Sequence, residues 1–268
     1  MILEPLNKEE LEKIFDVPAR QVIQYFLEKT LMLQPELKPN QEVLPIQIPK
    51  EHIEQWFVQA LNAQSVGAGS YPVDILMPNQ YGADVKMLSC VIDANDNLKQ
   101  GSLSGETSLA QKFQGTGINL DSLFKNKQYE EILDGWKKIL YDKLCGVMKE
   151  RNVTKIYYFF FLRAGTTFYI CGCRVNPSEL GKASVNLEKS NNNNVWVDNF
   201  IDSNYGKITI YKAKKRMELR LFPYTWKIHN KVIEFPTKQN INRVDLRELA
   251  KDNGLSEYIK ENFKSMIN

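Results

Sequence analysis

The stretch Tyr71–Asp93, which reads YPVDILMPNQYGADVKMLSCVID, decides the fold. Two runs rich in apolar residues, 71–77 and 83–93, flank a segment that begins with Pro-Asn and ends with glycine. Proline, asparagine and glycine favour turns, so the pattern is typical of two antiparallel strands joined by a short loop. The sequence therefore predicts a β-hairpin at this point of the chain.

Two acidic residues and a lysine occupy this hairpin. Asp74 lies in the first run, while Asp84 and Lys86 lie two residues apart in the second, so both project from one face of a strand. Antiparallel pairing brings Asp74 near Asp84. Two converging carboxylates favour Mg²⁺, and a neighbouring lysine can orient a water molecule or offset charge on a phosphate. The chain's other acid-x-Lys triplet, Glu36-Leu-Lys38, lies outside any strand-like run.

Helical and strand periodicities flank the hairpin in a definite order. Before it, apolar residues at i, i+3, i+4, i+7 and i+8 predict an amphipathic helix over 50–64. After it, the pattern predicts a long helix over 127–150, then a strand over 155–162 that is apolar on both faces, and another over 166–175. The expected fold class is α/β, a mixed α+β sheet flanked by helices.

This order, with Pro72-Val-Asp74 and Asp84-Val-Lys86, resembles the PD-(D/E)xK nuclease superfamily. Residues 50–162 match the family's core of a helix, a strand meander that bears the acids and the lysine, a second helix and a further strand. The resemblance implies a restriction-endonuclease-like core and Mg²⁺-dependent cleavage of double-stranded DNA. Many members are type II restriction endonucleases that act as homodimers, so a homodimer is expected here as well.

By the same resemblance, Asp74 and Asp84 are the metal-binding acids and Lys86 is the catalytic lysine. Family members often carry a further glutamate on the first helix; Glu54 and Glu51 both qualify, and Glu54 is favoured. The sequence departs from the family pattern in two respects. A valine splits the usual Pro-Asp pair, and no clear strand is visible between the first helix and Asp74.

The predicted catalytic core spans residues 49–176 of what we expect to be one compact domain. Residues 1–48 predict a helical preface that leads into a proline-rich connector, 35–49. Residues 177–268 predict a β-rich extension that contacts DNA and ends in helices. Its expected elements are strands over 195–200, 208–212 and 217–222 and helices over 245–250 and 256–266. Within the core, the Gly/Ser/Thr-rich segment 96–117 predicts an ordered loop with a short helix over 108–113.

The extension also carries a cluster of cations that suits a DNA backbone. Between Lys207 and Arg220, six basic residues stand against one acid and alternate with apolar residues, so one face of a strand pair is expected to be apolar and the other basic. The segment Glu106–Lys112 is either a phosphate contact or the start of a helix, and the asparagines 191–194 are either a groove contact or a simple loop tip. The predicted DNA-binding residues are Lys112, Lys207, Lys212, Lys214, Lys215, Arg216 and Arg220.

The composition excludes several other classes of protein. With 43% hydrophobic and 25% charged residues, the chain is typical of globular proteins and unlike disordered or collagen-like ones. No apolar run approaches the roughly 20 residues that cross a bilayer, so no membrane partner is expected. Four scattered cysteines, interpreted as reduced thiols, and a start unlike a signal peptide predict a cytoplasmic protein. The absence of a P-loop motif predicts no nucleotide cofactor.

These observations lead to one principal hypothesis and two alternatives. The principal hypothesis is a Mg²⁺-dependent type II restriction endonuclease that cuts double-stranded DNA at a specific sequence and leaves 5′-phosphate and 3′-hydroxyl ends. The first alternative is a repair or recombination nuclease of the same fold that acts on DNA structure. The second is a non-catalytic DNA-binding protein whose acids are incidental.

Overall fold

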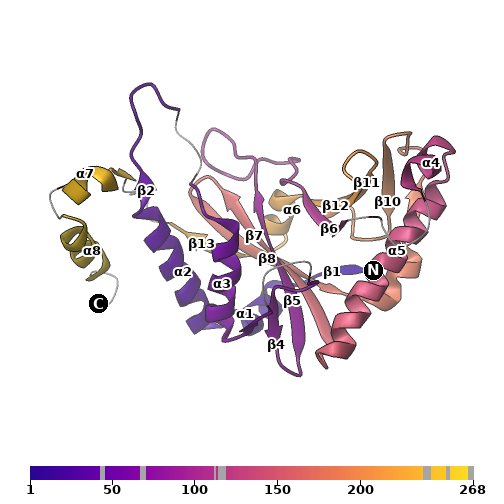
Figure 1. Ribbon diagram of the computed structural model, residues 1–268, viewed down its shortest axis with the longest axis horizontal. Helices are drawn as coiled ribbons and strands as arrows, with labels where there is room; N and C mark the ends of the chain where they lie inside the picture. The colour runs from indigo at the N-terminus through magenta and orange to yellow at the C-terminus, as the bar shows by residue number, and fades with distance from the viewer. Residues whose placement is uncertain are drawn as a thin grey trace.

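A computed structural model of the chain describes residues 1–42, 46–66, 71–111, 113, 119–237, 243–251 and 254–264. Helices flank a seven-stranded mixed sheet, and a five-stranded antiparallel sheet lies beside it (Figure 1). The two sheets share one hydrophobic cluster, so they belong to one continuous core. The mixed α/β class predicted from the sequence is confirmed.

The large sheet is built around two parallel strands, β5 (Tyr81–Ser89) and β7 (Lys155–Ala164). Parallel neighbours need a long crossover connection, and the one between these strands contains α4 (Leu120–Lys125) and α5 (Tyr129–Glu150). The strand order is β1-β8-β7-β5-β4-β3, with β13 also paired to β8, and every pairing except β5 with β7 is antiparallel. The other strands are β1 (Leu3–Pro5), β3 (Gln64–Ser65), β4 (Ile75–Met77), β8 (Thr167–Val175) and β13 (Ile233–Pro236).

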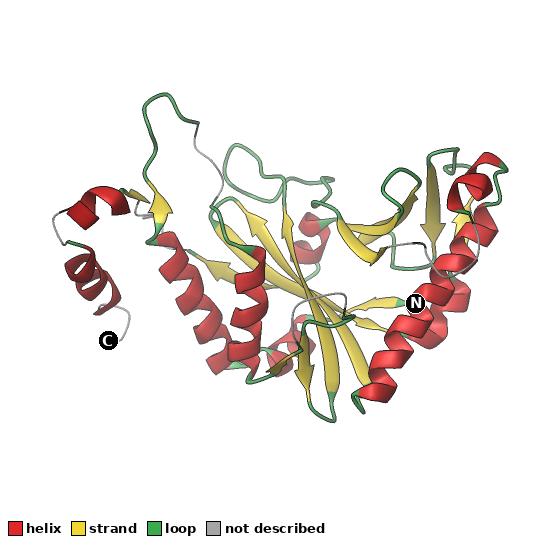
Figure 2. Cartoon of the chain, in the orientation of Figure 1, coloured by secondary structure: helices red, strands yellow, loops and turns green. Residues whose placement is uncertain are grey.

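Strand β7 is apolar on both faces because each face of the sheet is covered (Figure 2). Phe159 and Phe161 lie in the cluster formed with α1, α2 and α3. Phe160 and Leu162 lie in the other cluster, which contains the buried residues of α5. The helices of the first face are α1 (Lys8–Ile14), α2 (Val17–Leu31) and α3 (Lys50–Leu61).

The small sheet has the order β6-β12-β11-β10-β9, and its apolar face joins the cluster beneath α5. Ile208, Ile210 and Leu219 are buried there. The apolar face predicted for the strand pair in the C-terminal extension is therefore confirmed. The strands are β6 (Thr107–Gln111), β9 (Ser184–Asn186), β10 (Asn194–Asp198), β11 (Gly206–Tyr211) and β12 (Arg216–Leu221).

Two details of the hairpin's surroundings correct the sequence interpretation. The short helix expected over 108–113 is wrong: strand β6 forms there, because pairing with β12 buries Leu109 and Ala110 in the core. A strand also exists between the first helix and Asp74. Helix α3 ends at Asn62, whose left-handed φ of 50° turns the chain into the two-residue strand β3.

Two short helices, η1 (Pro177–Lys182) and α6 (Pro223–Ile228), add to the core. Trp226 of α6 is fully buried, and its indole N–H donates to the carbonyl of Tyr205 at 2.8 Å. This tryptophan, whose place the sequence left undecided, is therefore a core residue with a satisfied polar end.

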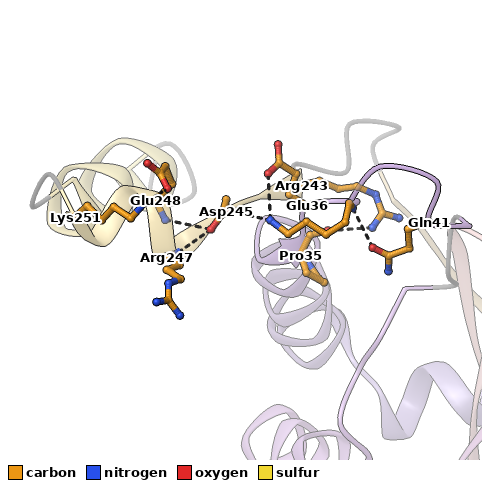
Figure 3. A network of polar contacts seen from close by, with 9 residues as sticks. Pro35, Glu36, Gln41, Arg243, Asp245, Arg247, Glu248 and Lys251 are labelled. Atoms are coloured by element: carbon orange, nitrogen blue, oxygen red, sulfur yellow. Dashed lines mark hydrogen bonds and ion pairs between the residues drawn. The ribbon is translucent and has the colours of Figure 1, made fainter.

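The C-terminal residues form a peripheral unit attached through the start of the connector. Strand β14 (Arg243–Val244) pairs in parallel with β2 (Gln34–Pro35), and α7 (Leu246–Lys251) and α8 (Leu255–Lys264) follow. Figure 3 shows Asp245 at the junction, where its carboxylate accepts from Lys38 at 2.9 Å and from the first backbone N–H groups of α7. One aspartate thus both caps the helix and ties it to the body.

Within the described residues, no helix is both long and apolar enough to cross a membrane. All four cysteines are free thiols.

Candidate active site

The backbone of the β4–β5 hairpin holds Asp74 in place. Asp74 directly precedes β4, and its N–H donates to the carbonyl of Ala83 at 2.9 Å, which extends the pairing beyond the strand. Its carboxylate turns back and accepts from the N–H of Val85 at 2.7 Å. A single carboxylate oxygen is therefore fixed against β5, next to the position of Asp84.

Asp84 and Lys86 project from the face of β5 that looks toward α5. Their neighbours on the parallel strand β7 are Tyr158 and Phe160, which belong to the α5 cluster, while Val85 points into the opposite cluster. Asp84 is only 5% exposed, and the ammonium of Lys86 contacts its carboxylate. The structure thus brings Asp74, Asp84 and Lys86 together, since the Asp74 carboxylate is held against β5 beside Asp84 and its charge acts on the Asp84 carboxyl.

Burial dominates the electrostatics of this group. Burial raises the pKa of the Asp84 carboxyl, the Lys86 ammonium opposes this rise and the negative charge of Asp74 adds to it, and the net value is about 7. Burial likewise raises the pKa of Tyr158, with the charge of Asp84 as a smaller cause. A cation that binds here stabilises the ionised form of the Asp84 carboxyl, because it compensates the negative charge that burial disfavours.

A second lysine, Lys143 of α5, faces the same group and was missed in the sequence interpretation. The charges of Asp84, Lys86 and Asp74 all act on it, and burial lowers its pKa. A signal was present in the sequence. Trp136, Leu140 and Val147 are buried at spacings of four and seven residues, and Lys143 occupies the remaining place in that stripe. A lysine inserted in a buried helical stripe indicates an ionic neighbour across the interface.

The segment that leads into Asp74 is anchored to the end of α5. The phenol oxygen of Tyr71 accepts from Nε of Arg151 at 3.0 Å and donates to Glu150 at 3.4 Å. The guanidinium of Arg151 lies 5.0 Å from the centroid of the Tyr71 ring. These contacts fix the hairpin relative to the helix that carries Lys143.

The helix that carries the additional glutamate predicted for the metal site lies on the other side of the sheet from the acid pair. Glu54 lies on α3, which packs against the sheet face opposite Asp84 and Lys86. The side chain of Glu51 lies outside the described part of the structure. Among the described residues, no group of three or more His, Cys, Asp or Glu side chains is placed to hold a metal ion. A role for Glu54 stays a prediction.

Ion pairs within the small sheet already engage part of the predicted basic stripe. Lys214 and Arg220 both contact the carboxylate of Glu106, and Lys214 also lies 3.3 Å from Glu218, whose side chain is buried. Lys207 lies over the ring of Trp196 at 4.7 Å. Glu106, the first residue of the segment 106–112, is therefore the internal partner of two cations.

The remaining cations of the stripe lie toward the loops of the same sheet. Lys215 is 3.9 Å from Asp121, and both side chains are exposed. Lys212 lines a groove of about 400 Å³ together with Lys125 and Asn192, so one of the predicted asparagines of the 191–194 tip borders a cationic hollow. Lys112 lies outside the described residues. Arg216, at the start of β12, is exposed.

Comparisons of the chain with protein-family models, with curated proteins and with solved structures find no match.

Proposed function

We propose that this protein is a Mg²⁺-dependent endonuclease that hydrolyses double-stranded DNA at specific sequences, with the character of a type II restriction enzyme. The observation that carries the proposal is the meeting of Asp74, Asp84 and Lys86 on one face of the β4–β5 hairpin. Two neighbouring carboxylates offer the hard oxygen donors that Mg²⁺ prefers, and an ammonium beside them can assist metal-dependent phosphodiester hydrolysis.

The arrangement of elements around these residues supports the proposal. Helix α3 is followed by the antiparallel meander β3-β4-β5, then by the crossover that contains α5, then by β7 parallel to β5. That is the order expected from the resemblance to the PD-(D/E)xK superfamily. Strand β3 supplies the part of the meander that the sequence pattern did not show.

The residues present fit a magnesium ion. Asp74 and Asp84 offer hard oxygen donors, and burial and the neighbouring acid disfavour the ionised form of Asp84, which a cation would stabilise. These two carboxylates would hold the ion, with water completing the shell. When bound, Mg²⁺ supplies positive charge that favours ionisation of a water molecule and offsets the charge on the phosphate oxygens.

The side chains of Asp84 and Lys86 would have separate roles in the reaction. A cation held by Asp84 would favour its carboxylate form, with the proton released to solvent, and the ammonium of Lys86 would donate a hydrogen bond to the attacking water or to the phosphate. In the hydrolysis one oxygen–phosphorus bond forms to water while the bond from phosphorus to the 3′ oxygen breaks. The water loses a proton and the leaving oxygen gains one, which yields 5′-phosphate and 3′-hydroxyl ends.

The proposed partners are double-stranded DNA and a second copy of the chain. Lys207, Lys212 and Arg216 provide cations near the small sheet for the DNA backbone. The homodimer and a cytoplasmic location follow from the resemblance and the sequence, and sedimentation of the purified protein with and without DNA tests the dimer.

The decisive experiment is digestion of a fully sequenced phage DNA with purified protein and Mg²⁺, followed by mapping of the fragment ends. We expect discrete fragments whose ends carry 5′-phosphate, and no cleavage with EDTA. The variants Asp84→Asn and Lys86→Ala should lose at least about 10²-fold in rate, while Asp142→Asn, an exposed residue of α5, should cleave normally.

The alternative functions give different outcomes in the same experiment. Smeared products, or cleavage that requires ends or junctions, indicate a repair or recombination nuclease. Salt-sensitive DNA binding without any cleavage, unchanged by Mg²⁺ and by Asp84→Asn, indicates a non-catalytic DNA-binding protein and overturns the proposal.

A further inference from the structure

Lys143 of α5 carries an ammonium into the neighbourhood of the acid pair. It is half-buried, in the stripe of α5 formed by Trp136, Leu140 and Val147. Within the described part of the chain it forms no ion pair or hydrogen bond. The ammonium of Lys143 is therefore available to a ligand that enters beside the acid pair.

The two lysines of the site differ in what they touch. Lys86 contacts the carboxylate of Asp84, with which it shares a strand. Lys143 comes from the opposite side of the site, because α5 covers the face of the sheet from which Asp84 and Lys86 project. Its charge interacts with both acids and with Lys86, although it is not bound to any of them. The site therefore has one engaged and one available ammonium.

The charges of the site indicate the kind of ligand that Lys143 can meet. Two aspartates and two lysines balance when all four are ionised. A divalent cation held by Asp74 and Asp84 adds two positive charges, so a ligand that enters with the cation has to be anionic. A phosphodiester, with one negative charge and two non-bridging oxygens, meets this requirement, and a lysine binds phosphate as a compact point charge.

We propose that Lys143 binds a non-bridging oxygen of the phosphodiester that is cleaved, and that Lys86 is the lysine that assists the attacking water. This inference rests on the proposed nuclease function and assigns the second cation of its site. The phosphate would lie between the β5 face and α5, with the acids on one side and Lys143 on the other.

The test compares Lys143→Met, which keeps the length and removes the charge, with Lys143→Arg, which keeps the charge. The control is Lys138→Met, an exposed lysine of the same helix. Binding of a duplex that contains the mapped cleavage sequence is measured by fluorescence anisotropy in EDTA over a range of salt concentrations. Cleavage rates are measured with Mg²⁺, and thermal unfolding is measured without DNA.

A phosphate-binding lysine has three signatures. In Lys143→Met, the slope of log affinity against log salt should become shallower by about one unit, and cleavage should slow by roughly 10²- to 10³-fold. Lys143→Arg should recover most of the slope, and the control should match wild type in both. Without DNA, Lys143→Met should unfold at the same temperature as wild type or higher, because it removes a charge that partial burial disfavours.

Other results separate this inference from the proposed function. If wild type cleaves with Mg²⁺ and Lys143→Met retains its rate and salt slope, the assignment of Lys143 is overturned while the nuclease function stands. A lowered unfolding temperature for Lys143→Met would show instead that Lys143 supports the fold by stabilising the acids, and would also overturn it. If wild type shows no Mg²⁺-dependent cleavage, the proposed function fails and this inference fails with it.

Discussion

Replacing Asp84 by asparagine tests the electrostatics of the site without any substrate. The pKa of the Asp84 carboxyl is raised from 3.8 to about 7, chiefly by burial. The folded protein therefore keeps this proton to near-neutral pH, whereas the unfolded chain loses it near the ordinary pKa. The stability that the proton contributes is complete below the ordinary pKa and is lost as the pH rises through the folded value.

The size of the effect follows from the shift. Each pKa unit corresponds to about 1.4 kcal/mol, so a shift of roughly three units is equivalent to about 4 kcal/mol in total. Proton linkage assigns roughly 2.5 kcal/mol of this loss to the interval between about pH 5 and pH 8. Asparagine keeps the shape and does not ionise, so the stability of Asp84→Asn relative to wild type should rise by that amount over the interval.

Urea unfolding in EDTA at about pH 5, 6.5 and 8 measures this difference. The matched control is Asp142→Asn, which changes an exposed carboxylate of α5 in the same way and should follow wild type at every pH. Mg²⁺ should stabilise wild type but not Asp84→Asn at the highest pH, because a ligand that binds only the folded state raises its stability. A stability difference that stays constant across the pH range would refute the assignment of a raised pKa to Asp84.

Three further changes test other parts of the structure. Gly135→Ala places a Cβ about 2.6 Å from the ring of Phe113 and should lower the free energy of unfolding by about 1–3 kcal/mol. The control Gly146→Ala, which has open space on the same helix, should raise the free energy of unfolding by up to about 1 kcal/mol. Equal urea midpoints for the two variants would contradict this prediction. Glu106→Gln removes the carboxylate shared by two cations of the small sheet and should lower the free energy of unfolding by about 1–2 kcal/mol. The released cations should strengthen salt-sensitive DNA binding in a filter assay, and weaker binding would count against their role in DNA contact. Arg151→Ala removes the hydrogen bond and ring contact that hold Tyr71 and the hairpin to α5. The cleavage rate should fall while the unfolding temperature changes little, and an unchanged cleavage rate would rule out a positioning role for Arg151.

Much of the candidate site follows from local patterns. The residue spacing in the hairpin placed Asp84 and Lys86 on one face of β5, and the turn brought Asp74 to the same level. The apolar strand at 155–162 and the long helix before it were recognisable because their periodicities of two and 3.6 residues are properties of the chain itself. Strand β3 was not recognisable, since two residues carry no periodicity and the strand exists only through pairing with β4.

The strand β6 shows why propensity alone misleads. A short helix was expected over 108–113, yet the open edge of β12 and a place in the core stabilise the extended strand β6 over 107–111. The basic stripe shows the same dependence on tertiary contacts. Its alternation along β11 and β12 was readable, but the carboxylate of Glu106, over 100 residues away, engages two of its cations.

By itself, the sequence determined the order of the main helices and strands around the hairpin, and the hairpin that presents two aspartates and a lysine, because hydrophobic periodicity and turn residues act over a few neighbouring positions. Only the tertiary structure decided that Asp84 is buried deeply enough to hold its proton near neutral pH and that Lys143 faces it from α5. Both depend on the packing of a helix against a sheet, which joins segments some sixty residues apart. Desolvation and charge coupling arise from that packing, and the lysine in the apolar stripe of α5 marks a polar contact in the sequence without identifying its partner.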